Sequence, residues 1–209
     1  GSKGAAELIF KSFYHSFFKL RNSKIKVAVA RAGNVIGGGD WAKDRIVVDA
    51  VSAWNKNKIV NIRSPNATRP WQHVLEPLSG YLNLAMKLLN NDNLNGEAFN
   101  FGPHTQQNIT VKNLLSEMSK YWGFNNVNDA LDVKDDNSFH EATLLKLNCE
   151  KSLYFLNWYS TLDYEDTVRF TSKWYHSYYK NSDNMELITI KQITEYESIA
   201  VSKQLQWTA

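Results

Sequence analysis

The stretch Arg31-Ala-Gly-Asn-Val-Ile-Gly-Gly-Gly-Asp-Trp41 decides how the chain folds. It follows a run of small and apolar residues, 25–30, which is typical of a buried β-strand. Glycines 37–39 allow a sharp turn and a close approach of backbone to a ligand, while Asn34 and Asp40 supply an amide and a carboxylate. Ligands of open α/β sheets bind beyond the carboxyl ends of the strands, so this turn is a candidate ligand site.

The same turn also fits a purely structural role, because glycine-rich turns after strands are common and most of them bind nothing. It lacks both common phosphate-binding patterns, since no Gly-Lys-Ser/Thr follows the glycines and no G-x-G-x-x-G is present. The spacing alone therefore indicates an α/β protein with a candidate phosphate site.

The composition of the chain bounds the class of protein. Of its 209 residues 43% are hydrophobic, which predicts a globular protein, and the net charge of +3 weakly favours a small anionic ligand over nucleic acid. A single cysteine, Cys149, excludes an internal disulfide and suits a reducing cytoplasm. No signal peptide and no membrane-spanning apolar run is recognisable. The five histidines are scattered, so we expect no metal site.

Hydrophobic periodicity predicts an alternation of helices and strands. Apolar residues at helical spacing in 3–19 predict an amphipathic helix whose aromatic side chains, Phe13 and Phe17 among them, pack in the core. Asp44 is expected to cap the next helix and Thr110 a later one that ends at Gly123. The predicted helices are 3–19, 45–57, 76–89, 110–122, 151–156 and 163–179, and the predicted strands are 25–30, 58–63, 98–101 and 142–147. Residues 184–209 have no clear placement.

Three motifs resemble the CDP-glucose 4,6-dehydratase family of the extended short-chain dehydrogenase/reductase superfamily. They are 31–41, Asp44-Arg-Ile-Val47 and Arg69-Pro-Trp-Gln-His-Val-Leu-Glu-Pro-Leu-Ser-Gly-Tyr-Leu82, and the resemblance extends to about Tyr179. It implies an α/β fold that combines the carboxyl-terminal portion of a Rossmann-type NAD-binding fold with a smaller α/β substrate-binding lobe. The implied division is 1–35 and 70–91 for the Rossmann lobe, 36–69 and 92–180 for the nucleotide-sugar lobe, and 181–209 for a carboxyl-terminal extension.

Arginines are natural partners of a diphosphate, because the guanidinium fork matches two phosphate oxygens, although an isolated arginine is more often a solvated surface residue. Arg45, Arg63 and Arg69 all lie near predicted loops. The sequence pattern does not favour one of these arginines over the others. The resemblance favours Arg69 for the diphosphate and disfavours Arg63. It implies that the substrate-binding residues are Asn34, Arg45, Arg69, Asn108 and His140. His73 is expected to be structural.

The resemblance also implies a catalytic and cofactor-binding role for Lys3, which matches the lysine of the family's Tyr-x-x-x-Lys motif and would contact the nicotinamide ribose and lower the tyrosine pKa. Arg31 is a second expected NAD contact. The tyrosine would lie before Gly1, so we expect a chain that is truncated at its amino terminus and inactive alone.

The implied function is conversion of CDP-glucose to CDP-4-keto-6-deoxyglucose with bound NAD. We expect a cytoplasmic homodimer or higher homo-oligomer, with no nucleic-acid or membrane partner, in deoxysugar synthesis for O-antigen lipopolysaccharide. The alternatives are another NAD-dependent nucleotide-sugar dehydratase or epimerase, and a non-catalytic fragment that binds nucleotide sugar.

Overall fold

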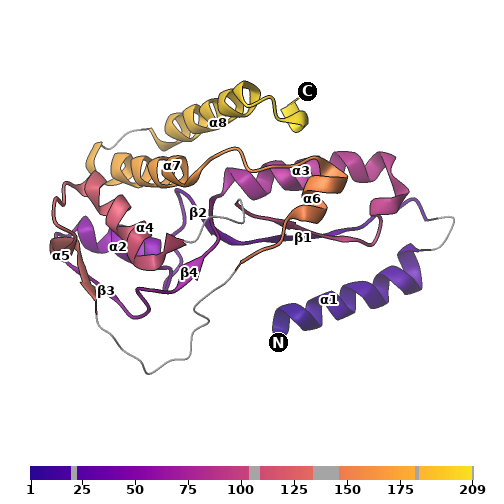
Figure 1. Ribbon diagram of the computed structural model, residues 1–209, viewed down its shortest axis with the longest axis horizontal. Coiled ribbons are helices and arrows are strands. Elements are labelled where there is room, and N and C mark those ends of the chain that lie inside the picture. The colour runs from indigo at the N-terminus through magenta and orange to yellow at the C-terminus, as the bar shows by residue number, and fades with distance from the viewer. Residues whose placement is uncertain (20–22, 104–108, 134–145, 182–183, 209) are drawn as a thin grey trace.

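Parallel strand pairs connected by helices define the architecture of the chain. The computed structural model describes residues 1–19, 23–103, 109–133, 146–181 and 184–208 (Figure 1). Within these residues the strands form four pairs, three of them parallel. The pairs are β1 (Val29–Ala32) with β6 (Ala98–Phe101), β2 (Asn34–Ile36) with β5 (Trp71–His73), β3 (Val60–Ile62) with β8 (Leu131–Val133) and, antiparallel, β4 (Thr68–Arg69) with β7 (Ile109–Thr110). Parallel pairs need helical crossovers, so the fold is α/β.

Helices account for most of the remaining described residues. The α-helices are α1 (Ser2–Phe13), α2 (Ile46–Trp54), α3 (Leu75–Asn90), α4 (Val111–Ser119), α5 (Val127–Ala130), α6 (Glu150–Leu156), α7 (Tyr164–His176) and α8 (Met185–Ser202). Short 3₁₀ or π turns occupy Tyr14–Phe18, Asp92–Leu94, Lys120–Trp122, Ser177–Asn181 and Gln206–Thr208.

Side-chain caps set several helix boundaries. The Thr110 hydroxyl accepts a hydrogen bond from the Asn113 amide at the start of α4, as predicted. Gly123 follows the end of that helical segment in the left-handed conformation, with φ of 81°, which also agrees with the prediction. The Asp163 carboxylate accepts from the Asp166 amide and begins α7 at the residue that the sequence indicates.

The described residues bury their apolar side chains in one large and two smaller clusters. The large cluster lies among α2, α4, α7 and strands β3 and β5, and includes Trp54, Trp71 and Trp174. A second cluster, with Phe99 and Phe101 of β6, lies under α3 and α6. In Figure 1, α3 and α6 lie on one side of β1 and α1 on the other.

The prediction that the aromatic residues of the first helix pack in the core is wrong for Phe13 and Phe17. Their side chains are 52% and 59% exposed, and α1 buries none of its residues. The helix is held by the ion pair of Glu7 with Arg31 and near its carboxyl end, where the Tyr14 hydroxyl donates to the Asn95 carbonyl oxygen at 2.8 Å. The amphipathic pattern predicts an apolar face, but its side chains at Ile9, Phe13 and Phe17 are exposed, while Phe10 and Tyr14 beside them are half-buried.

Two local predictions at the glycine-rich stretch are corrected. The expected strand 25–30 forms further along the chain, as β1 and β2, because residues 29–32 find their hydrogen-bonding partners in β6. Asp44 does not cap α2, because it has a left-handed φ of 62° and Arg45 occupies the N-cap position. An N-cap residue needs extended geometry, which Arg45 has. The expected strand 142–147 lies mostly outside the described residues.

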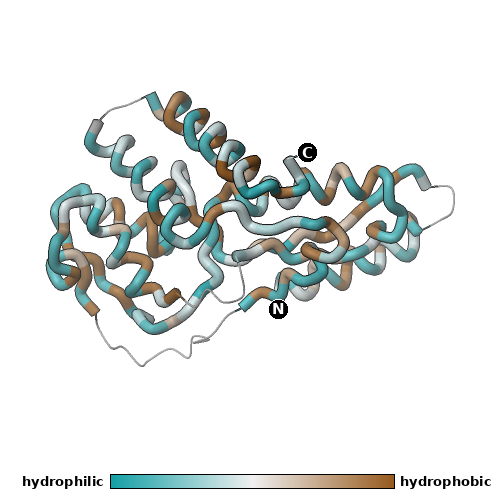
Figure 2. The backbone as a smooth tube through the Cα atoms, turned by 45° about the horizontal axis from the view of Figure 1, so that its top comes forward, coloured by the Kyte–Doolittle hydropathy of each residue, from teal (hydrophilic) through white to brown (hydrophobic). Residues whose placement is uncertain are grey.

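The carboxyl-terminal helix α8, which the sequence does not place, packs along α7. Gln192 donates to the Phe170 carbonyl oxygen at 2.7 Å, and the Trp174 indole donates to the Thr189 hydroxyl at 3.0 Å. Hydrophobic residues recur along α8 in Figure 2, and Leu187 is 54% exposed. No helix among the described residues is both long and apolar enough to cross a membrane.

The division into two lobes stays a prediction. Strand β6 lies in the range assigned to the nucleotide-sugar lobe, yet it pairs with β1 of the range assigned to the Rossmann lobe.

Candidate functional site

The pairing of short strands brings Asn34 and Arg69 to the same part of the fold. Asn34 begins β2 and lies opposite Trp71 of β5, which is two residues after Arg69. Gly33 allows this approach, since a Cβ at that position would lie 2.9 Å from the Pro70 carbonyl oxygen. Both Asn34 and Arg69 are half-buried, so each can present polar atoms to a ligand while its backbone stays fixed.

Arg69 lies on the two-residue strand β4, opposite Ile109 of β7. Its Nη1 donates to the neighbouring Thr68 carbonyl oxygen at 2.8 Å. A guanidinium carries five N–H donors in a fork that matches two phosphate oxygens. The residue has the position and the donors that a diphosphate ligand would require.

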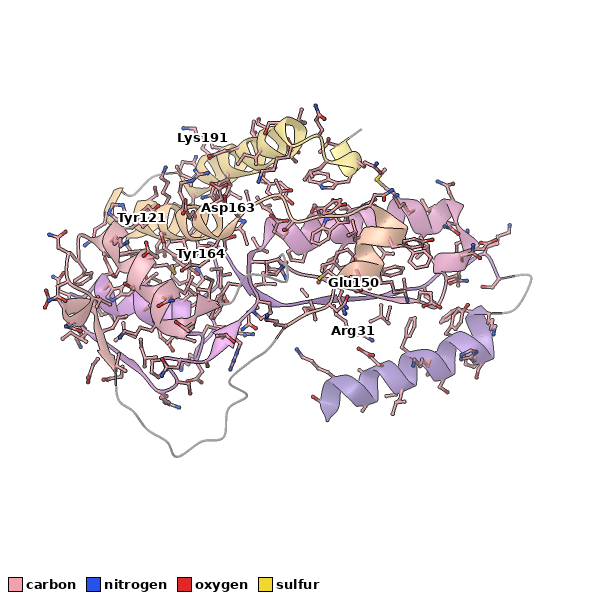
Figure 3. The ribbon with its side chains drawn as sticks, in the orientation of Figure 1. Arg31, Tyr121, Glu150, Asp163, Tyr164 and Lys191 are labelled. Atoms are coloured by element: carbon pink, nitrogen blue, oxygen red, sulfur yellow. The ribbon has the colours of Figure 1, made fainter. Side chains whose placement is uncertain are left out.

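Arg31, a predicted cofactor contact, is engaged by α1. In Figure 3 it lies between β1 and α1. Its Nε and Nη2 both donate to the Glu7 carboxylate, and its Nη1 lies 3.4 Å from the Asn100 amide oxygen. The hydrogen bond from Arg31 lowers the pKa of Glu7 below its ordinary value of 4.5. Each of the three guanidinium nitrogens of Arg31 therefore already has a partner within the protein.

Two of the four remaining predicted residues belong to the described part of the chain. Lys3 is exposed in the first turn of α1, and Arg45 is exposed at the start of α2. Asn108 and His140 lie outside the described residues. Among the five predicted residues that the structure describes, strand pairing brings Asn34 and Arg69 together.

The glycine-rich turn has a packing role that the sequence does not reveal. A Cβ on Gly38 would overlap the ring of Trp174, which comes from α7. The Tyr175 hydroxyl donates to the Asp40 carbonyl oxygen at 2.8 Å, and the Trp41 ring packs against Tyr178 with centroids 4.8 Å apart. Packing against α7 therefore explains why position 38 has no side chain, and this explanation requires no ligand.

Two buried ionisable residues lie at the end of β5 and in the first turn of α3, and the sequence pattern does not indicate the second of them. Glu76 is 1% exposed, and its carboxylate accepts from the amides of Thr161 and Leu162 and from the Tyr196 hydroxyl. Burial raises the pKa of Glu76 to about 7 in spite of these hydrogen bonds. No local pattern signals this, because all three partners are at least 85 residues away.

His73 is 2% exposed, in agreement with its expected structural role. Its Nδ1 lies 3.4 Å from the Leu75 amide, and its Nε2 has no hydrogen-bond partner among the described residues. Burial lowers the pKa of His73 to about 4, which keeps the ring neutral near neutral pH. A neutral, enclosed imidazole packed on Phe170 with ring centroids 5.4 Å apart supports the core.

An open groove of about 850 Å³ lies between α4 and α7. Its walls include Glu117, Lys120, Tyr121 and Tyr164, and Figure 3 shows both tyrosines on this side of the molecule. Lys120 and Glu117 form an ion pair at 2.6 Å. Of the predicted site residues that the structure describes, none lines this groove, but Ile109, the strand partner of Arg69, does.

Sequence comparison identifies a curated relative. The chain is 40% identical over 201 residues to the CDP-glucose 4,6-dehydratase of Salmonella typhimurium strain LT2, across 94% of its own length and 55% of that protein. The chain resembles a CDP-glucose 4,6-dehydratase. It spans about half the length of this relative, and no family model matches it.

Solved structures show the same fold at lower identity. The dTDP-glucose 4,6-dehydratase of Bacillus anthracis, determined with NAD, has a TM-score of 0.66 and 19% identity, over 84% of this chain and 51% of the other. The UDP-glucose 4-epimerase of Thermotoga maritima, determined with UDP-glucose, has a TM-score of 0.64 and 18% identity, over 84% and 52%. Pal from Bacillus thuringiensis has a TM-score of 0.66 and 25% identity, over 85% and 52%. The chain therefore has the Rossmann-type α/β fold of dehydratases and epimerases.

Proposed function

We propose that this chain is the carboxyl-terminal, nucleotide-sugar-binding part of a CDP-glucose 4,6-dehydratase. The 40% identity with such an enzyme over 94% of the chain carries the proposal. The strand junction supports it, because a half-buried arginine and a half-buried amide lie together where a diphosphate could bind both. The complete protein would convert CDP-glucose to its 4-keto-6-deoxy derivative.

In this proposal Arg69 binds the diphosphate and Asn34 binds the phosphate on the sugar side. A planar guanidinium forms two parallel hydrogen bonds with phosphate oxygens, which fixes the orientation of the ligand as well as its affinity. Arg45, Asn108 and His140 stay proposed contacts of the nucleotide. Of these, Arg45 is described and is exposed at the start of α2.

The proposed cofactor is NAD, which would accept a hydride from the sugar and return it. Lys3 fits a cofactor contact, because its side chain is exposed at the first turn of α1 and its ammonium can donate to ribose hydroxyls. Its charge would also favour the ionised form of a neighbouring tyrosine. Arg31 fits less well, since Glu7 engages two of its donor groups.

We further propose a homodimer or higher homo-oligomer in the cytoplasm that serves deoxysugar synthesis for O-antigen lipopolysaccharide. The exposed apolar side chains of α1, which include Leu8 at 70% and Ile9 at 59%, support association with another surface.

A second candidate function is another nucleotide-sugar dehydratase or an epimerase. The shared fold of the Thermotoga maritima epimerase favours this class, but at 18% identity it shows the fold alone. Discrimination between the two rests on which nucleotide the site prefers.

The proposal is tested by replacing Arg69 and measuring the affinity for CDP-glucose by calorimetric titration. Arg69→Ala should weaken binding by roughly 1.5–3 kcal/mol, the range for hydrogen bonds to charged groups. Arg63→Ala is the matched control, because Arg63 is an exposed arginine of the loop that follows β3 and should leave the affinity unchanged. Equal affinities for all three proteins would remove Arg69 from the site.

A further inference from the structure

Trp71 occupies the point where the strands that carry Asn34 and Arg69 meet. It is the first residue of β5, and its side chain is 4% exposed in the large hydrophobic cluster. Its backbone lies opposite Asn34 in the β2–β5 pair. Arg69 precedes it by two residues, with only Pro70 between them, so the short chain from Arg69 to Trp71 has little freedom.

The indole of Trp71 forms a hydrogen bond with β7, the strand that pairs with β4. Its Nε1 donates to the Ile109 carbonyl oxygen at 3.2 Å. Ile109 is the residue opposite Arg69 in the β4–β7 pair. The backbone of Trp71 is therefore aligned with Asn34, while its side chain is bonded to the strand partner of Arg69.

Strand β4 needs this support because it is only two residues long. The two-residue pair is extended on one side only, by hydrogen bonds from the Val111 and Lys112 amides to the Ala67 and Pro65 carbonyl oxygens. Burial of the Trp71 ring together with the indole bond anchors β7, and β7 in turn holds β4. The placement of the Arg69 backbone relative to Asn34 thus depends on the buried side chain of Trp71.

We propose that Trp71 is a positioning residue, which sets the spacing of Asn34 and Arg69 for the two phosphates of a nucleotide sugar. This inference rests on the proposed function, because it assigns Trp71 a role in the affinity for the diphosphate and not only in stability. Trp71 itself does not contact the ligand.

Trp54 provides a matched control for the test. It is 1% exposed in the same hydrophobic cluster, and its Nε1 also donates to a backbone carbonyl oxygen, that of Ala130, at 3.1 Å. Trp54 is the last residue of α2, and its hydrogen-bond acceptor is the last residue of α5. None of the proposed ligand-binding residues that the structure describes is located there. Replacement of either tryptophan by phenylalanine removes the N–H donor and keeps an aromatic ring.

The experiment measures CDP affinity by calorimetric titration of the chain and of Trp71→Phe and Trp54→Phe, well below their unfolding temperatures. Both variants should unfold at a lower temperature than the unmodified chain. Only Trp71→Phe should bind CDP more weakly, by roughly fivefold to tenfold, the size expected for imperfect hydrogen bonding to a charged group. Equal CDP affinities of the two variants would overturn the role of Trp71.

A double variant separates positioning from general loosening. If Trp71 acts through Arg69, then Trp71→Phe should cause much less loss of CDP affinity in an Arg69→Ala background than in the unmodified chain. Full additivity would show that Trp71 does not act through Arg69. Failure of the unmodified, folded chain to bind CDP would instead overturn the proposed function, and the role of Trp71 with it.

Discussion

Helices α1 and α7 have similar sequence patterns but opposite surroundings. Both carry aromatic residues at helical spacing, yet α1 buries none of its residues, while α7 buries seven, including Phe170, Trp174 and Tyr175. Helix α7 packs against the glycine-rich turn on one side and α8 on another. An amphipathic pattern therefore predicts an apolar face, but the presence of partners decides whether that face contributes to the stability of the chain.

The largest test of this contrast removes a phenylalanine from each helix. Phe170→Ala should destabilise the chain by about 3–5 kcal/mol, because the 1%-exposed ring leaves a cavity beside His73. Phe13→Ala should change the free energy of unfolding by no more than about 0.5 kcal/mol, since Phe13 is 52% exposed. Urea unfolding of both variants measures the difference. Similar losses for the two variants would show that α1 is covered in solution.

The pH dependence of stability sharpens the contrast, because Glu7 of the exposed α1 and the buried Glu76 of α3 have opposite pKa shifts. Burial raises the pKa of Glu76 from an ordinary 4.5 to about 7, so the folded chain retains a proton that the unfolded chain loses. Stability therefore falls as pH rises from 4.5 to 7. The lowered pKa of His73 acts in the opposite sense, and adds stability as pH rises from about 4 to 6.5.

Glu76→Gln should remove the loss of stability that Glu76 causes as pH rises. It should leave the gain of stability that His73 causes. Relative to this variant, the unmodified chain should lose up to about 3 kcal/mol of stability between pH 4.5 and 7 and show no further change above pH 7. Glu7→Gln is the control in α1, where the hydrogen bond from Arg31 lowers the pKa and favours stability above pH 4.5. Parallel stability curves for the chain and Glu76→Gln would contradict a protonated, buried Glu76.

The smallest expected changes in stability come from replacing Gly38, which packs against α7, and Gly4, which lies in α1. Gly38→Ala should destabilise the chain by about 1–3 kcal/mol, because the added methyl group overlaps the Trp174 ring. Gly4→Ala in α1 should stabilise it by roughly 0.5–1 kcal/mol, since no atom lies within 4 Å of the new methyl group and alanine favours a helix. Thermal unfolding of both variants reports the two signs. Destabilisation by Gly4→Ala would contradict the open surroundings of α1.

The sequence predicts features that depend on neighbouring residues. The cap at Thr110, the left-handed Gly123 and the start of α7 after Asp163 are all confirmed. Each one requires only contacts within a few residues, so the local pattern contains the necessary information.

Features that depend on distant residues are not predictable in this way. The contact of Gly38 with Trp174 and the bond of Glu76 with Tyr196 join residues that are more than 100 positions apart. The sequence therefore does not decide between a ligand-binding and a structural role for the glycines, and it gives no sign of the buried glutamate. The approach of Asn34 and Arg69 was expected from family resemblance alone, because the spacing of these residues does not determine which strands pair.

The central claim is that the junction of Asn34 and Arg69 forms a site for a cytidine nucleotide. The most direct test is calorimetric titration of the folded, monodisperse chain with CDP, UDP and dTDP in turn. We expect the chain to bind CDP with clear preference over UDP and dTDP. We expect Arg69→Ala to lose that binding. Equal binding of all three nucleotides, or no binding of any by the folded chain, would contradict it.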